Sequence, residues 1–133
     1  MAYTVLIVDG EPMVRRSLAL LLETYGYQVA MARNARQAMT AFPNVDPDAV
    51  FMELGMAEVG GAETIEEMRR LKPGAKIIGM DQKDPFAEPD FRSSANKLGA
   101  DALIAKPFEA EDVLHVLTDQ LLPECRLPEL AFA

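Results

Sequence analysis

The fold of this chain is decided by a short stretch near its start, Val5-Leu6-Ile7-Val8-Asp9-Gly10-Glu11-Pro12. Four consecutive aliphatic residues predict a strand that is buried on both faces, and the polar residues after them end it. From Val14 to Tyr25, apolar side chains then recur at helical spacing, and Gly26 is typical of a helix end. A buried strand followed at once by an amphipathic helix is the unit from which parallel α/β sheets are built.

The same strand–helix unit recurs along the rest of the chain. Further strands are predicted at residues 27–31, 49–52, 76–80 and 102–105. Further helices are predicted at about residues 35–42, where Asn34 is the expected cap, and at 62–71, 89–98 and 110–122. This alternation predicts an α/β fold with a five-stranded parallel sheet and helices on both of its faces.

The length and composition fit one domain. The chain has 133 residues, and 50% of them are hydrophobic, which is enough to bury a core. We expect the domain to occupy residues 1–122. Residues 123–133 are too short to fold alone, so we expect a C-terminal tail or the start of a linker there.

Charge and cysteine content exclude several classes of partner and place. The net charge of −8 argues against a nucleic acid or an anionic membrane surface as partner, since both require clustered Lys and Arg. The sequence has no apolar run long enough to span a membrane, and its start lacks the basic residues of a signal peptide. With Cys125 as its single cysteine, the chain fits a reducing compartment, so we expect a cytoplasmic protein.

Charged residues lie where the predicted strands end. Asp9 and Glu11 follow the first strand, Glu53 closes the third, Asp81 follows the fourth and Lys106 follows the fifth. In a parallel sheet these strand ends lie on one edge, and binding sites form there. We therefore expect these side chains to gather into one site.

Three segments of the chain resemble a known family. They are Val5-Leu6-Ile7-Val8-Asp9-Gly10-Glu11-Pro12, Pro47-Asp48-Ala49-Val50-Phe51-Met52-Glu53-Leu54 and Gly99-Ala100-Asp101-Ala102-Leu103-Ile104-Ala105-Lys106-Pro107-Phe108. Over about residues 3–122 the chain resembles the receiver domain of two-component response regulators, of which the chemotaxis regulator is the simplest member. The resemblance implies a flavodoxin-like sheet with strand order 2-1-3-4-5. It also implies a cis peptide bond before Pro107.

The resemblance implies a phosphotransfer site. In the family, an aspartate at the position of Glu53 takes a phosphoryl group from a histidine kinase. Acidic residues at the positions of Asp9 and Gly10 help that aspartate to hold Mg²⁺, and a lysine at the position of Lys106 contacts the phosphoryl oxygens. A Ser or Thr at the position of Asp81 and an aromatic residue at the position of Leu103 then switch conformation.

Four of these positions depart from the family pattern. Glu53 is longer than aspartate by about 1.5 Å, and its carboxylate would reach into the space of the phosphoryl group. Gly10 provides no metal ligand, Asp81 cannot donate a hydrogen bond when ionised, and Leu103 cannot act as an aromatic switch. Only Asp9 and Lys106 keep the family's residues.

These departures predict a site that no longer transfers phosphate. We expect no enzymatic activity and no resident cofactor, and Asp9 and Glu53 are the residues left to hold Mg²⁺, with Glu11 as a separate neighbouring acid. Because like carboxylates that crowd together cannot all ionise cheaply, we also expect Lys106 to bridge Glu53 or Asp81.

The leading hypothesis is a receiver domain that acts as a phosphorylation-independent protein-interaction module. Its partners would be a histidine kinase, a downstream effector or a second copy of the chain, bound through the face that the family forms from helix 4, strand 5 and helix 5. Two alternatives remain: a divergent receiver that still accepts a phosphoryl group, and a small-molecule sensor at the strand-end pocket. Whether the domain is locked in an active-like or an inactive-like state is open.

Overall fold

The computed structural model describes residues 2–55, 61–82 and 99–122. The helix predicted at 89–98 and the tail at 123–133 lie outside these residues. The strands of the described part are β1 (Thr4–Val8), β2 (Gln28–Ala32), β3 (Ala49–Glu53), β4 (Lys76–Gln82) and β5 (Ala102–Lys106). The helices are α1 (Pro12–Thr24), α2 (Ala35–Val45), α3 (Gly61–Leu71) and α5 (Ala110–Leu121).

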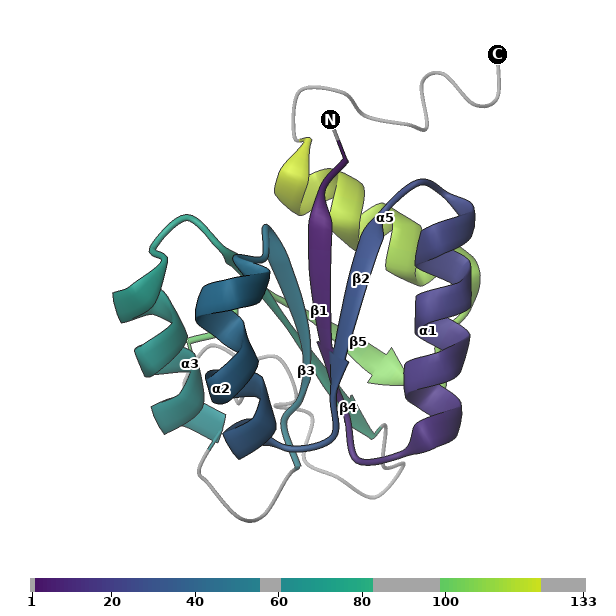
Figure 1. Cartoon of the computed structure of the whole chain (residues 1–133). Coiled ribbons are helices and arrows are strands. Elements are labelled where there is room, and N and C mark those ends of the chain that lie inside the picture. Colours follow the sequence, from purple (N-terminus) through teal and green to yellow (C-terminus); the bar gives the residue numbers. More distant parts are fainter. Residues whose placement is uncertain (1, 56–60, 83–98, 123–133) are drawn as a thin grey trace.

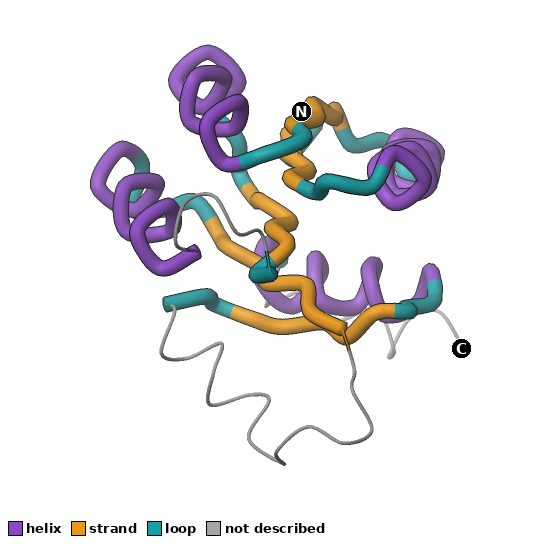
Figure 2. Tube along the Cα trace, turned by 90° about the horizontal axis from the view of Figure 1, so that it is seen from below, coloured by secondary structure: helices purple, strands orange, loops and turns teal. Residues whose placement is uncertain are grey.

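The strands form one sheet in the order β2-β1-β3-β4-β5, and every neighbouring pair is parallel. The parallel sheet is the one that the sequence pattern predicts, and the strand order is the one that the family resemblance implies. Helices α2 and α3 cover one face of the sheet, and α1 and α5 cover the other (Figures 1 and 2). Within the described residues, no helix has the length and apolar character needed to cross a membrane.

Strand β1 separates two apolar cores. Val5 and Ile7 pack with α1 and α5, whereas Leu6 and Val8 pack with α2 and α3. All four side chains are fully buried. Burial of each such side chain stabilises the fold by roughly 1.5–3 kcal/mol, which explains why a run of four aliphatic residues forms a central strand.

The predicted starts and ends of several elements are confirmed. The Asn34 side chain caps α2 by accepting a hydrogen bond from the backbone N–H of Gln37 at 2.8 Å. Gly26 has φ = 90°, the left-handed backbone conformation that favours glycine after a helix. The peptide bond between Lys106 and Pro107 is cis, as the family resemblance implies.

Two strand ends lie farther along the chain than predicted. Asp81 lies within β4 rather than after it, and Lys106 is the last residue of β5 rather than the residue that follows it. The cause is strand pairing, because Asp81 pairs with Ala105 and Gln82 with Lys106, which extends both strands.

Candidate functional site

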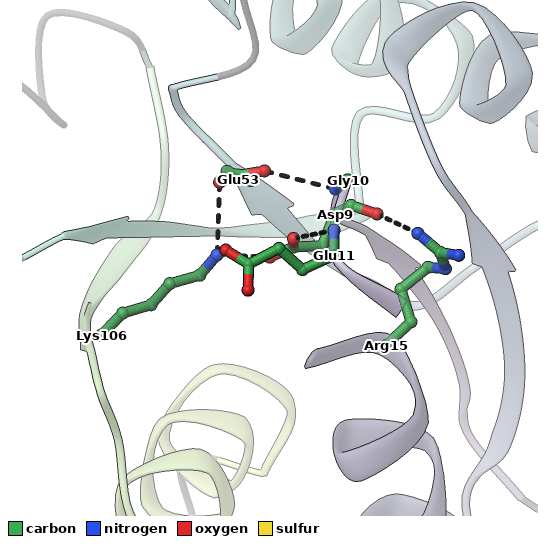
Figure 3. Close-up of polar contacts among 6 residues, drawn as sticks. All are labelled: Asp9, Gly10, Glu11, Arg15, Glu53 and Lys106. Carbon is green, nitrogen blue, oxygen red and sulfur yellow. Dashed lines mark hydrogen bonds and ion pairs between the residues drawn. The ribbon is translucent and has the colours of Figure 1, made fainter. Parts of the chain in front are cut away.

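The carboxyl ends of three strands bring together Asp9, Glu53 and Lys106. These ends lie at the lower edge of the sheet in Figure 1 and are enlarged in Figure 3. The Nζ atom of Lys106 lies 2.5 Å from Oδ2 of Asp9 and 3.3 Å from Oε2 of Glu53. The partners are 97 and 53 residues away in the sequence, so only the parallel order of β1, β3 and β5 makes this contact.

Lys106 and Asp9 form a buried ion pair. Asp9 is fully buried, and Lys106 exposes only 6% of its surface. Burial by itself would lower the pKa of Lys106. The hydrogen bond and charge of Asp9, together with Glu53, outweigh that effect and raise the pKa of the lysine above its ordinary value. Lys106 therefore stays charged, and its single positive charge is shared by two carboxylates.

Backbone groups of the β1–α1 loop hold the two carboxylates in place (Figure 3). The N–H of Glu11 donates to Oδ1 of Asp9 at 2.9 Å, and the N–H of Gly10 donates to Oε1 of Glu53 at 3.3 Å. Arg15 donates from Nη1 to the backbone oxygen of Asp9 at 2.7 Å. Each carboxylate oxygen of Asp9 and of Glu53 thus accepts a hydrogen bond.

Steric crowding does not require a glycine at position 10. A Cβ atom at this position would meet its nearest neighbours, the backbone oxygen of Arg33 and Oε1 of Glu53, only at 3.9 Å. The absence of a third carboxylate next to Asp9 is therefore a property of this sequence and not a requirement of the backbone.

Three carboxylates could still offer ligands to a cation. Asp9, Glu11 and Glu53 can each place one oxygen within 4.8 Å of the others. Carboxylate oxygens suit a hard cation such as Mg²⁺, but Asp9 and Glu53 are already bound to Lys106. The donor set fits such a cation by chemistry, and the ammonium group of Lys106 competes for two of its three members.

The structure confirms one part of the expected charge arrangement and extends it. Lys106 does bridge to Glu53, as predicted, but its shorter contact is to Asp9, which the prediction did not name. A signal for this contact existed in the sequence, because an acid directly after a fully buried strand needs a compensating charge. Asp81 is half-buried, and it lies on β4 beside Ala105.

The other predicted switch position, Leu103, lies on β5 opposite Gly79 of β4. A Cβ atom on Gly79 would come within 2.8 Å of Cδ1 of Leu54 and 3.2 Å of Cδ1 of Leu103. The absence of a side chain at Gly79 lets these two leucines pack over β4. Sequence reasoning did not identify this contact.

A pocket of about 350 Å³ opens beside the acidic site. It lies between the start of α1 and the β5–α5 loop, and its lining is mainly apolar. The described residues that line it are Glu11, Met13, Val14, Ser17, Lys106, Pro107 and Phe108.

Comparison with known proteins identifies the family. A family model described as the response regulator receiver domain matches residues 5–118. The chain is 36% identical over 121 residues to the chemotaxis protein CheY of Thermotoga maritima, covering 88% of this chain and 96% of that protein. It is 32% identical over 109 residues to the regulatory protein AtoC of Escherichia coli, covering 82% of this chain but 23% of AtoC. The chain thus spans nearly all of one relative and only a part of another.

Solved structures agree with this assignment. The chemotaxis protein CheY4 of Vibrio cholerae superposes with a TM-score of 0.80 at 23% identity, covering 91% of this chain and all of CheY4. The CheY-like receiver domain protein of Methanospirillum hungatei superposes with a TM-score of 0.79 at 26% identity, covering 91% and 94% of the two chains. By its sheet order, its strand-end site and its matched residues, this chain belongs to the response regulator receiver domain family.

Proposed function

We propose that this receiver domain acts in two-component-type signalling as a protein-interaction module that does not depend on phosphorylation. The observation that carries the proposal is the closed network of Lys106, Asp9 and Glu53. Both oxygens of Glu53 accept hydrogen bonds, one from Lys106 and one from the backbone of Gly10. A phosphoryl acceptor needs an oxygen that is free to attack, whereas both oxygens of Glu53 are held by hydrogen-bond donors.

The family resemblance supports the same conclusion by another route. The position of the acceptor holds Glu53, the neighbouring ligand position holds Gly10, and the switch positions hold Asp81 and Leu103. Together the four changes remove three requirements of phosphotransfer: nucleophile placement at Glu53, metal binding at Gly10, and the switch formed by the positions of Asp81 and Leu103. We accordingly propose a domain with no enzymatic activity and no resident cofactor.

Receiver domains interact with histidine kinases and with effectors. For this chain we propose that a protein partner binds the surface formed by β5 and α5, the described part of the family's signalling face. The interaction would be present without a chemical trigger, because Lys106 already pairs with both carboxylates of the strand-end site.

A phosphorylation assay tests the proposal. The purified protein is incubated with Mg²⁺ and acetyl phosphate, and its intact mass is measured. We expect no gain of a phosphoryl group. The matched control is the triple variant Gly10→Asp, Glu53→Asp and Asp81→Thr, which restores family residues and should gain one group; Gly10 has room for the added side chain.

A stoichiometric, acid-labile gain on the unmodified protein would overturn the proposal and favour the alternative of a divergent phosphoacceptor. Loss of that gain in the variant Glu53→Gln would then assign the acceptor. If no gain occurs, Glu53→Gln separates two kinds of module. Unchanged partner binding indicates a passive surface, whereas weakened binding indicates that Glu53 imitates a phosphorylated aspartate.

The small-molecule alternative has one observation in its favour, the pocket of about 350 Å³ beside Lys106. Its volume lies at the low end of the range for ligand pockets, about 300–1,000 Å³. A fragment screen by ligand-detected NMR, with Met13→Ala as the control variant, would show whether this pocket binds small molecules.

A further inference from the structure

The pocket of about 350 Å³ beside the strand-end site combines an apolar wall with a few polar groups. The apolar lining comes from Met13 and Val14 of α1 and from Pro107 and Phe108, which follow β5. The polar lining comes from Glu11, Ser17 and Lys106. A mainly apolar hollow with a small number of polar groups is typical of sites for small molecules.

The apolar wall of this pocket is fixed on its inner side and adaptable on its outer side. Val14 and Phe108 are partly buried and pack against the core that α1 and α5 share. Met13 is exposed, and its unbranched side chain can adjust to the shape of a bound molecule. The pocket therefore needs no rearrangement of the core to receive an apolar group.

The ammonium group of Lys106 is not available to a ligand. It already pairs with Asp9 at 2.5 Å and with Glu53 at 3.3 Å, and its side chain is almost inaccessible to water. An anionic ligand would have to displace one of these carboxylates in order to reach it. Although Lys106 lines the pocket, the pocket does not favour an anion.

The carboxylate of Glu11 is the available charged group of the pocket. Its residue is exposed, and among the described residues it has no ion-pair partner. One of its oxygens lies within 4.8 Å of an oxygen of Asp9 and of an oxygen of Glu53. An opposite charge on a ligand would pair with Glu11 at small cost, because neither group has to leave water completely.

The surroundings of Glu11 favour a cation. Three carboxylates share the ammonium group of Lys106, and the guanidinium group of Arg15 is directed to the backbone oxygen of Asp9 on the far side of that residue (Figure 3). Arg15 does not line the pocket. The carboxylates therefore outnumber the cations at this end of the pocket, and a positive group on a ligand is complementary to it.

We propose that this pocket binds a small organic cation, with a primary ammonium group that pairs with Glu11 and an apolar body that contacts Val14 and Phe108. A bare metal ion would use the carboxylates and leave the apolar wall in water, whereas a neutral apolar molecule would leave Glu11 without a partner. The inference goes beyond the proposed function, since it gives the pocket a ligand class of its own and does not depend on phosphorylation.

The test compares three probes by titration into the ¹⁵N-labelled protein: phenethylamine, its neutral analogue 2-phenylethanol, and methylammonium. We expect phenethylamine to bind with a Kd in the range of roughly 0.1–10 mM, as is usual for so small a ligand. It should shift the amide signals of residues 13–17 and of Glu11, Lys106 and Phe108. The alcohol should bind about threefold more weakly because it lacks the charge, and methylammonium should not saturate because it lacks the apolar body.

A charge variant tests the role of Glu11. In Glu11→Gln, the affinity for phenethylamine should fall about threefold to that of the alcohol, and the affinity for the alcohol should stay unchanged. The matched control is Glu23→Gln, which removes an exposed acid of α1 that does not line the pocket and should leave both affinities unchanged. Because the alcohol carries no charge, a general structural effect of Glu11→Gln would weaken both ligands alike.

A filling variant tests the pocket itself. Ser17→Leu places a larger apolar side chain in the pocket and should abolish binding of both phenethylamine and the alcohol. The matched control is Thr24→Leu, at another exposed position of α1 outside the pocket, and it should bind both as before. Since both positions are exposed, each variant should fold, and its melting temperature verifies this.

Three results would overturn the inference: equal affinity for phenethylamine and the alcohol, undiminished binding to Ser17→Leu, or signal shifts outside the residues that line the pocket. The titration contains no phosphodonor, so its failure would reject this ligand class and leave the phosphorylation assay to decide the proposed function. A phosphoryl gain in that assay would reject phosphorylation independence without bearing on the pocket.

Discussion

Strand β5 borders two acidic regions that differ in how their carboxylates are buried and paired. At its carboxyl end, Lys106 pairs with both Asp9 and Glu53, and the shorter pair, to Asp9, is almost inaccessible to water. Along its outer side, Glu111 and Asp119 of α5 are exposed and line an open groove of about 500 Å³ between β5 and α5.

The difference separates acids whose charge must be compensated within the fold from acids whose charge is exposed to water. A charge that is buried must be compensated within the fold, because the cost of leaving it unpaired is several kcal/mol. A charge in water carries no such requirement, and it can contribute to recognition at small cost. The charges of the strand-end site therefore stabilise the fold, whereas Glu111 and Asp119 are not required to do so.

The largest expected effect comes from removing the cation of the buried site. The variant Lys106→Met leaves Asp9 buried without its partner, and this should lower the free energy of unfolding by about 3–5 kcal/mol. Unfolding in urea followed by circular dichroism measures the change. The control is Lys72→Met, since Lys72 pairs with Asp46 and Asp48 at the surface and its loss should cost about 0–1 kcal/mol.

A compensating variant separates charge from packing. Adding Asp9→Asn to Lys106→Met removes the unpaired charge, so part of the lost stability should return. Equal stability of Lys106→Met and Lys72→Met would mean that the buried ion pair of Lys106 does not stabilise the fold. The strand-end site would then not differ from the exposed acids of α5 in this respect.

A smaller effect is expected where the two regions meet. Leu54, which follows Glu53, and Leu103 of β5 both lie against Gly79. The variant Gly79→Ala places a methyl group 2.8 Å from Leu54, and this overpacking should cost about 1–3 kcal/mol.

The matched control is Gly74→Ala, where a Cβ atom would meet nothing within 4 Å. Its stability should stay within about 0.5 kcal/mol of the unmodified protein. In amide NMR spectra, Gly79→Ala should shift signals both near Glu53 and near Leu103. Shifts confined to one of these places would mean that the two regions are independent.

These contacts also show which features of the structure could be predicted from the sequence and which could not. The strand order and the meeting of Asp9, Glu53 and Lys106 followed from a buried apolar run, from acids at strand ends and from the family resemblance. The register of β4 with β5 did not follow, because pairing beyond residue 80 depends on backbone partners that no local pattern encodes. The packing of Leu54 and Leu103 over Gly79 is a contact between three strands, so it becomes visible only in the folded chain.

The smallest expected effect is a decline of stability at alkaline pH, and it belongs to the strand-end site alone. The pKa of Lys106 is raised in the folded protein, so above the ordinary lysine pKa of about 10.4 the folded state holds a proton that the unfolded state has lost. Stability should therefore be constant from neutral pH to about pH 10 and should fall as the pH rises further.

Tyr27 contributes to the same decline and must be separated from Lys106. Its pKa is raised by burial and, to a smaller extent, by the nearby Tyr3, so its sign is the same. In the variant Tyr27→Phe, urea unfolding at a series of pH values should show a shallower decline that persists above pH 10, and Lys106→Met added to it should remove most of the remainder. If Tyr27→Phe alone makes the stability independent of pH, the charge of Lys106 does not stabilise the strand-end site. In that case its carboxylates would differ from those of the groove in burial only, and not in how their charge is compensated.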